Sequence, residues 1–197
     1  MDKAEIKLIL EALLMVSDRP LSLDEMSKIV RKGNQRASRK GLLDALEELK
    51  EECEGRSYEL KEVASGYRYQ TRSQFAHWLA KLWEQKPPRY SRAALETLAL
   101  IAYKQPITRA AIEEVRGVAV NTSIIRSFEE RGWIKVVGHK ETPGHPALYA
   151  TTKNFLDDFN LCSTGDLPEL PDISNQEDIL PLQLANNESA EVLPKSE

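Results

Sequence analysis

Apolar positions in the first part of the chain follow helical and strand periods rather than long uninterrupted runs. Residues 10–16 form an apolar helical stretch, and leucines at helical spacing over residues 42–49 predict another helix that ends near Gly55. Residues 58–63 and 67–71 then predict the two strands of a hairpin. With a short serine-capped helix between the first two, the pattern predicts three helices followed by a β-hairpin.

The same pattern recurs further along the chain. Residues 95–101 (LETLALI) align with residues 10–16 (LEALLMV), and residues 105–108 (QPIT) align, after a one-residue insertion, with residues 19–22 (RPLS). In each copy an apolar helix, a turn with proline and a Ser or Thr N-cap lead into a second short helix. We therefore interpret the chain as a duplicated module.

Residues that mark helix ends support this interpretation. Ser22 and Glu25 have the spacing of a capping box, in which the serine oxygen and the carboxylate each accept a hydrogen bond from a free backbone N–H. Thr108 is the corresponding N-cap of the second copy. A third helix of that copy is predicted from a cap near Asn121 or Thr122 to a glycine stop at Gly132.

Two strand-like runs over residues 133–137 and 147–151 follow, on either side of a turn rich in glycine and proline. Three helices followed by a hairpin are typical of a winged helix-turn-helix domain. The sequence thus predicts a mainly α fold with small β-hairpins (α+β), organised as two tandem winged helix-turn-helix domains. The predicted boundaries are residues 1–84 and 92–162 for the domains, 85–91 for a linker and 163–197 for a disordered acidic tail.

One more helix is predicted between the two units. Its apolar stripe consists of Phe75, Trp78, Leu79, Leu82 and Trp83. A stripe of this kind is usually core. Because units of ~80 residues often associate, we also expect part of Trp78 and Trp83 to lie in an interface. The Pro-Pro break that follows marks the linker.

Composition limits the classes of protein that fit this pattern. The 197-residue chain is 41% apolar and 29% charged, which excludes general disorder, and its net charge of −4 argues against a protein that coats nucleic acid through its overall charge. Residues 163–197 carry eight acids, one base and no aromatic residue, and so bury too little apolar surface to fold. No apolar run approaches the ~20 residues that span a bilayer, and two cysteines fit a reducing cytosol. A soluble cytoplasmic protein is expected.

The sequence offers little chemistry. Its three histidines, His77, His139 and His145, have only Glu141 near them in the sequence, whereas a metal site needs three or four converging ligands. Phosphate-loop, dinucleotide and nucleophile-elbow motifs are missing from the sequence. We therefore expect no catalytic residue, no metal, no cofactor and no enzyme activity.

A winged-helix DNA-binding transcription regulator is the alternative that the pattern permits. In the third helix of the second copy, however, two acids offset two bases, which makes a weak phosphate-binding surface. The basic patch of the chain fits either a weak DNA contact or a solvated loop. It consists of Arg31, Lys32, Arg36, Arg39 and Lys40.

Several stretches of the chain resemble a known family, the bacterial segregation and condensation protein ScpB. The similarity is carried by residues 88–109 (PRYSRAALETLALIAYKQPITR), 112–118 (IEEVRGV), 138–146 (GHKETPGHP), 9–14 (ILEALL) and 66–69 (GYRY). It runs from about residue 5 to residue 161 and leaves the acidic tail outside.

The resemblance implies a non-enzymatic accessory subunit of the bacterial SMC condensin complex, located in the cytoplasm at the nucleoid. Proteins similar to ScpB are homodimers that pair through their N-terminal domains. They bind the central segment of the kleisin ScpA, largely through their C-terminal domains. ScpA bridges the heads of the SMC ATPase, so contact with SMC is indirect, and contact with DNA is at most weak and non-specific. The assembly condenses and segregates chromosomes.

These implied surfaces correspond to named candidates on this chain. A groove for an amphipathic kleisin segment needs aromatic and basic anchors, for which we expect Tyr103, Arg116, Lys140 and Tyr149. An isologous dimer needs a self-complementary apolar patch. The residues expected to shape the turns are Gly117, Gly144 and Pro146, and those expected in the dimer interface are Leu10, Leu13, Leu14, Trp78 and Trp83.

Overall fold

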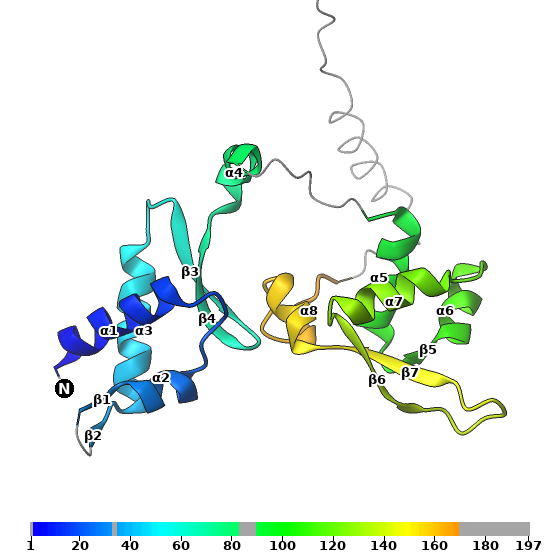
Figure 1. Cartoon of the computed structure of the whole chain (residues 1–197), viewed down its shortest axis with the longest axis horizontal. Coiled ribbons are helices and arrows are strands. Elements are labelled where there is room, and N and C mark those ends of the chain that lie inside the picture. Colours follow the sequence, from blue (N-terminus) through cyan, green and yellow to red (C-terminus); the bar gives the residue numbers. More distant parts are fainter. Residues whose placement is uncertain (1, 33–34, 83–89, 170–197) are drawn as a thin grey trace, which may run out of the picture. The chain divides into compact units, whose positions relative to one another are not determined.

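The computed structural model describes residues 2–32, 35–82 and 90–169 (Figure 1). We call residues 2–82 the N-terminal half and residues 90–169 the C-terminal half. Across these described residues the chain forms eight α-helices, two short 3-10 helices and small antiparallel sheets. This confirms the predicted class of fold.

The N-terminal half orders its helices and its main hairpin as the sequence predicts, and it adds a pair of two-residue strands at residues 31–32 and 35–36 that the sequence analysis did not predict. Helix α1 packs along α3, and its buried face joins α2 and the hairpin in one core that includes Leu10, Met26, Leu42 and Leu60. The elements are α1 (Lys3–Val16), α2 (Leu23–Ile29), β1 (Arg31–Lys32), β2 (Gln35–Arg36), α3 (Arg39–Glu52), β3 (Tyr58–Val63), β4 (Gly66–Thr71), η1 (Ser73–Phe75) and α4 (Ala76–Leu82).

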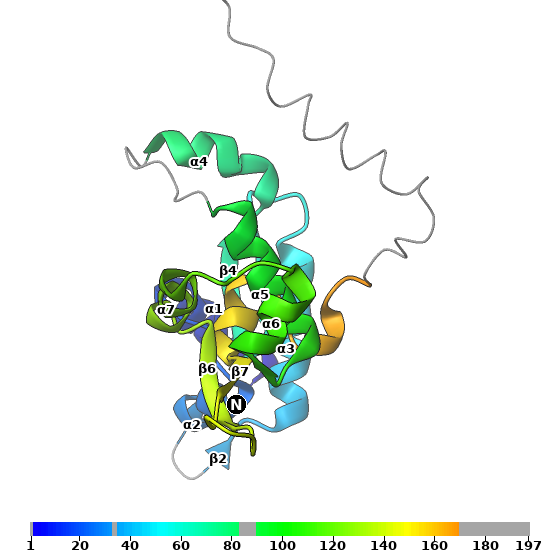
Figure 2. The ribbon, with the colours of Figure 1, turned by 90° about the vertical axis from the view of Figure 1, so that its right-hand side faces the viewer.

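The C-terminal half repeats this order, with a longer hairpin that projects beyond the helices (Figures 1 and 2). Its hairpin gains a third, two-residue strand that the sequence analysis missed, in the sheet order β5-β7-β6. Trp133 is buried with Phe128 and donates a 2.7 Å hydrogen bond from Nε1 to Asp158. The elements are α5 (Arg92–Lys104), β5 (Ile107–Thr108), α6 (Arg109–Arg116), α7 (Thr122–Glu130), β6 (Ile134–His139), β7 (Ala147–Thr151), α8 (Lys153–Asp158) and η2 (Thr164–Asp166).

Both halves attach their hairpin to the helices in the same way. The N–H and C=O groups of Leu21 and Tyr67 exchange two 2.9 Å hydrogen bonds, and Ile107 pairs with Tyr149 at the equivalent place of the second half. In the first half this contact depends on Gly66, because a Cβ there would lie 2.1 Å from the carbonyl oxygen of Leu21. The duplication therefore holds at the turn and the hairpin.

The first helices of the two halves do not follow the aligned register. Leu10 is buried, whereas the aligned Leu95 is exposed, and Val16 is exposed, whereas the aligned Ile101 is buried. The alignment of residues 10–16 with 95–101 is therefore wrong as a structural equivalence. Both helices carry apolar residues on more than one face, so matching letters do not identify the face that enters the core.

The predicted helix N-caps are confirmed. The Ser22 hydroxyl accepts the Glu25 N–H while the Glu25 carboxylate accepts the Ser22 N–H, which is the predicted capping box. Arg19 also donates to that carboxylate, and this bond and the Ser22 donors lower the pKa of Glu25 to about 2. Thr108 caps α6, and Asn121 caps α7.

Three expectations change or fall outside the description. The stripe on α4 is not core: Trp78 is 66% exposed, because no other described element covers this helix. The predicted tail starts too early, since residues 164–166 form η2 and Asp166 accepts hydrogen bonds from the Cys162 and Ser163 N–H groups. Trp83, most of the predicted linker 85–91 and residues 170–197 lie outside the described residues.

Two glycines with positive φ provide a test of the hairpin contact. Gly66 has φ 139° and no room for a Cβ, whereas Gly55 has φ 73° and nothing within 4 Å of that position. We expect Gly55→Ala to lower the free energy of unfolding by about 1 kcal/mol, from backbone strain alone. Gly66→Ala should lower it by more than about 3 kcal/mol, because the Leu21–Tyr67 pair must also separate. Urea unfolding followed by circular dichroism measures both, and equal losses would contradict the role assigned to Gly66.

Candidate protein-interaction surfaces

The outer face of α1 carries an apolar groove. Leu8 and Val16 in it are 62% and 87% exposed. Exposed apolar patches rimmed by polar groups are typical of protein contacts. The lining residues are Glu5, Leu8, Ile9, Ala12, Leu13, Val16, Ser17, Leu21 and Ile29.

Two of the residues expected in a dimer interface are not on the surface. Leu10 and Leu14 are buried in the core of their own half, so they are not available to a second chain. Leu13 is half-buried and lines the groove, and Trp78 is exposed on α4. Helical periodicity shows which residues share a face, but α1 has two apolar faces, and the periodicity did not tell them apart.

Arg116, an expected anchor for the kleisin, is held by its own half. It ends α6, its side chain is 9% exposed, and its Nη2 lies 3.2 Å from Oε2 of Glu96 on α5. Arg92 binds the other carboxylate oxygen at 2.9 Å. Hydrogen bonds from Arg92 and then Arg116 lower the pKa of Glu96, so this carboxylate stays ionised. The three side chains form a charged cluster across α5 and α6.

The other three expected anchors lie elsewhere in the C-terminal half. Tyr103 is exposed near the end of α5, about 10 Å along the helix from Glu96 at 1.5 Å per residue. Tyr149 is half-buried in the middle strand of the sheet, and burial raises the pKa of its hydroxyl. Lys140 is exposed between β6 and β7. The structure therefore does not bring the four residues to one point.

The expected turn residues lie at chain reversals. Gly117 ends α6 with φ 69°, and its N–H donates to the Glu113 carbonyl. Gly144 has φ 88° in the connection between β6 and β7. The carbonyl of Pro146 accepts the Lys140 N–H at 2.9 Å, which closes that connection.

Sequence reasoning missed exposed apolar residues that are next in sequence to members of the charged cluster. Leu95 adjoins Glu96 and is exposed, and Val115 and Val118 are exposed on either side of Arg116 and Gly117. The sequence contained a signal for Leu95, because this apolar residue directly precedes Glu96. Nothing in the local sequence indicated that Arg116 binds Glu96, because the two residues are 20 positions apart.

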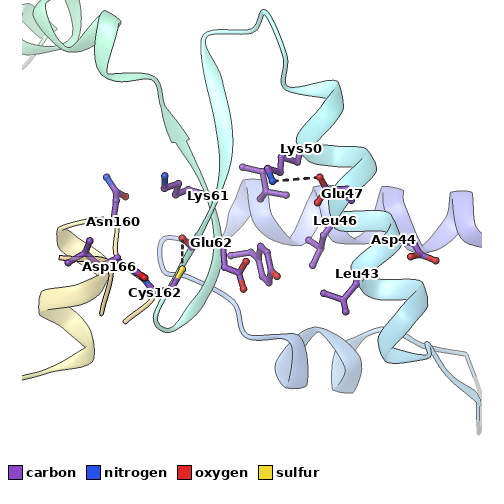
Figure 3. Close-up of a pocket in the computed structure, with 13 residues that line it drawn as sticks. Leu43, Asp44, Leu46, Glu47, Lys50, Lys61, Glu62, Asn160, Cys162 and Asp166 are labelled. Carbon is purple, nitrogen blue, oxygen red and sulfur yellow. Dashed lines mark hydrogen bonds and ion pairs between the residues drawn. The ribbon is translucent and has the colours of Figure 1, made fainter. Parts of the chain in front are cut away.

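A second cavity, of about 670 Å³, lies between α3, the hairpin β3–β4 and the segment after α8 (Figure 3). Leu43, Leu60 and Leu161 are among its apolar lining residues, and Glu62 and Asp166 are among its charged ones.

Backbone and side-chain hydrogen bonds hold α8 and the segment after it on this hairpin. The Ala64 N–H donates to the Leu161 carbonyl and the Ser65 N–H to the buried Asp157 carboxylate, both at 2.9 Å. Arg68 donates to the Asp157 carbonyl at 2.8 Å. The Cys162 thiol lies 3.5 Å from the Glu62 carbonyl oxygen. No local sequence signal predicts these contacts, because about 90 residues or more separate the partners.

Part of the basic patch can be placed. Arg39 and Lys40 are exposed at the start of α3, and Arg39 lies 3.9 Å from the Asp24 carboxylate. The side chains of Arg31, Lys32 and Arg36 lie outside the described residues.

Within residues 2–32, 35–82 and 90–169, no helix is long and apolar enough to cross a membrane. In the same part of the chain, no three His, Cys, Asp or Glu side chains come together as a metal would require.

Exposed apolar strips beside fixed charges, as found here, are the kind of surface by which subunits of protein assemblies contact one another. Residues 8–170 match the family described as segregation and condensation complex subunit ScpB. The segregation and condensation protein B homolog of Coxiella burnetii is 50% identical over 179 residues, which cover 91% of this chain and 85% of that protein. The chain therefore belongs to the ScpB family.

Two solved structures are also similar. ScpB from Mycobacterium tuberculosis is 35% identical to this chain. The matched region covers 82% of this chain and 98% of that protein, with a TM-score of 0.38. A dimer of an ScpB N-terminal domain complexed with ScpA peptide is 29% identical, over 41% of this chain and 96% of that one, with a TM-score of 0.36. Because both TM-scores are below 0.5, the family assignment rests on the match to the family model and on sequence identity to the relatives.

The native thiol of Cys162 tests the contact between the hairpin and the segment after α8. Because Cys162 lies against Glu62, the variant Glu62→Cys should form a disulfide with it inside one chain. Loss of solvation raises the pKa of the Cys162 thiol, so the oxidation is run at pH 9. Non-reducing electrophoresis should show a faster-migrating monomer.

Two controls accompany this experiment. The pair Glu62→Cys with Cys162→Ser should give no fast species, and neither should Glu54→Cys, which is exposed and outside the cavity. A disulfide-linked dimer in place of the fast monomer would show that the contact forms between two chains instead.

Proposed function

We propose that this protein is a non-enzymatic accessory subunit of the bacterial SMC condensin complex, which acts as a homodimer that binds the central region of the kleisin ScpA. SMC is reached only through ScpA, and the protein acts at the nucleoid in the cytoplasm in chromosome condensation and segregation during cell division. Membership of the ScpB family supports this function. ScpA is the partner to test because another ScpB N-terminal domain forms a complex with an ScpA peptide.

We assign a different role to each copy of the duplicated module. Each half has three helices followed by a hairpin, which supports two winged helix-turn-helix domains over residues 1–84 and 92–162 with a linker at 85–91. The first domain carries the apolar groove on α1 and is proposed to dimerise. The second carries the exposed apolar residues around the Glu96–Arg116 pair and is proposed to bind the kleisin.

The kleisin site is proposed because exposed apolar residues adjoin a charged pair that is already fixed. Leu95, Val115 and Val118 supply apolar contacts, while Arg116 is already held by Glu96 and loses little side-chain freedom when a partner binds. An amphipathic helix of ScpA would place its apolar face on these side chains. No cofactor or metal is needed for binding of this kind.

The DNA-binding regulator has weaker support. On α7, the helix that would enter the major groove, Arg126 lies 2.9 Å from Glu130, and this neighbouring acid offsets part of its attraction for a phosphate. Among the side chains of the basic patch that the structure describes, Arg39 and Lys40 provide exposed positive charge on α3, and these two bases give a small electrostatic contribution. Weak, salt-sensitive DNA contact is compatible with these residues.

The kleisin site is tested by titration calorimetry with a purified ScpA central fragment. Leu95→Glu places a charge in the proposed apolar contact and should weaken binding by at least about tenfold. Leu43→Glu introduces the same charge at an exposed leucine of the N-terminal half and should change the affinity by less than about threefold. Wild-type affinity of Leu95→Glu would reject the site, whereas a wild-type protein that does not bind ScpA would reject the function.

A further inference from the structure

The turn of the first hairpin is bound by the C-terminal half. Ala64 and Ser65 are the two residues that connect the paired ends of β3 and β4. Backbone N–H groups in such a short turn project away from the ladder, where water is their usual partner. Here the Ala64 N–H donates to the Leu161 carbonyl and the Ser65 N–H to the Asp157 carboxylate, each at 2.9 Å. The two halves therefore meet at this turn.

The two acceptors are held in place by the end of α8. Asp157 is 7% exposed, and the next residue, Asp158, accepts a hydrogen bond from Trp133 in the C-terminal half. Asn160 has φ 58°, and the Leu161 N–H donates to a carbonyl of α8 at 2.8 Å, a geometry that turns the chain away at a helix end. One acidic residue of α8 thus anchors the helix in its own half, while its neighbour binds the hairpin of the other half.

Arg68 contributes both hydrogen bonds and a cost to this contact. Its Nη2 donates to the Asp157 carbonyl at 2.8 Å and to the Asn160 side chain at 3.0 Å. Its Nε is buried and has no hydrogen-bond partner among the described residues. A buried N–H without an acceptor is unfavourable, and it gains a partner when water reaches it. Separation of the two halves would therefore relieve an unfavourable feature of the contact.

The cavity beside this contact depends on it. Helix α3 and the hairpin line one side of the cavity, and the segment after α8 lines the other with residues that include Leu161 and Cys162 (Figure 3). The Cys162 thiol lies 3.5 Å from the Glu62 carbonyl oxygen. Movement of that segment away from the hairpin would turn the cavity into an open face of the N-terminal half.

We propose that this contact is a latch, which is closed when the turn at residues 64–65 binds Asp157 and Leu161 and open when the halves separate. Polar contacts between two parts of one chain allow such motion, unlike large apolar interfaces. The two surfaces assigned above, on α1 and around the Glu96–Arg116 pair, keep a fixed spacing only when the latch is closed. The inference goes beyond the proposed function and depends on neither the homodimer nor ScpA.

Hydrogen exchange of single backbone amides, followed by NMR on the full chain, measures how often the latch opens. The Ala64 and Ser65 N–H groups should exchange more slowly than in an unstructured peptide, because the closed latch binds both. They should exchange faster than the Leu21 N–H, which pairs with Tyr67 inside the N-terminal half. Exchange at the rate of an unstructured peptide would overturn the closed state, and exchange as slow as that of Leu21 would overturn the opening.

Variants of Asp157 test which group holds the turn. Asp157→Ala should speed exchange at Ser65 by at least about tenfold, because the N–H loses a charged acceptor. Asp157→Asn keeps an acceptor oxygen and should retain most of the protection. The Thr152 N–H, which donates to the Trp133 carbonyl, reports whether the C-terminal half stays folded. Unchanged exchange at Ser65 in a folded Asp157→Ala protein would overturn the role of Asp157.

The variant Glu62→Cys tests the opening with Asp157 intact, and so decides the matter even where Asp157→Ala does not fold. Its disulfide with Cys162 would hold the latch closed, so oxidation should slow exchange at Ala64 and Ser65 by at least about tenfold relative to the reduced variant. Exchange at Leu21 should stay the same. Equal rates at the turn in the oxidised and reduced monomer would overturn the opening. A disulfide-linked dimer would show that the contact joins two chains and would overturn the latch.

Discussion

Each half of this protein depends on one short antiparallel backbone contact. The residue after the inter-helix proline pairs with a tyrosine of the second hairpin strand, Leu21 with Tyr67 and Ile107 with Tyr149. A unit of ~80 residues has a small core, so the hairpin must be anchored by hydrogen bonds as well as by apolar packing. At Gly66 the two backbones approach so closely that no Cβ fits. This contact places the hairpin beside the helices, and the surfaces of the half are arranged around it.

The features that the sequence predicts correctly are local ones. The Ser22–Glu25 capping box and the caps at Thr108 and Asn121 involve residues two or three positions apart, so their geometry follows from spacing. The hairpins are equally local, because alternation and a turn define both strands. The two-residue strands were missed: β1 and β2, and β5, which joins the sheet through Tyr149 far along the chain.

The features that sequence analysis did not predict depend on distant partners. Periodicity grouped Trp78 with the other apolar residues of α4 but gave no information on what covers them, and in the described residues nothing does. Arg116 is recognisable as a basic helix end, yet its partner Glu96 lies 20 residues away. The Ser65–Asp157 hydrogen bond joins residues 92 positions apart. Interactions over such separations depend on the tertiary arrangement, which a one-dimensional pattern does not specify.

The change of register between α1 and α5 explains why the two halves present different surfaces. In α5 the aligned position of Val16 is the fully buried Ile101, so the apolar residues there mostly satisfy the core of their own half. In α1 the core takes the face with Leu10 and Leu14, and the second apolar face, with Val16, is turned outward. An apolar helix face that is left in water is costly. Since α3 covers one face of α1, the other requires a surface from outside this core, and this requirement distinguishes the N-terminal half from its duplicate.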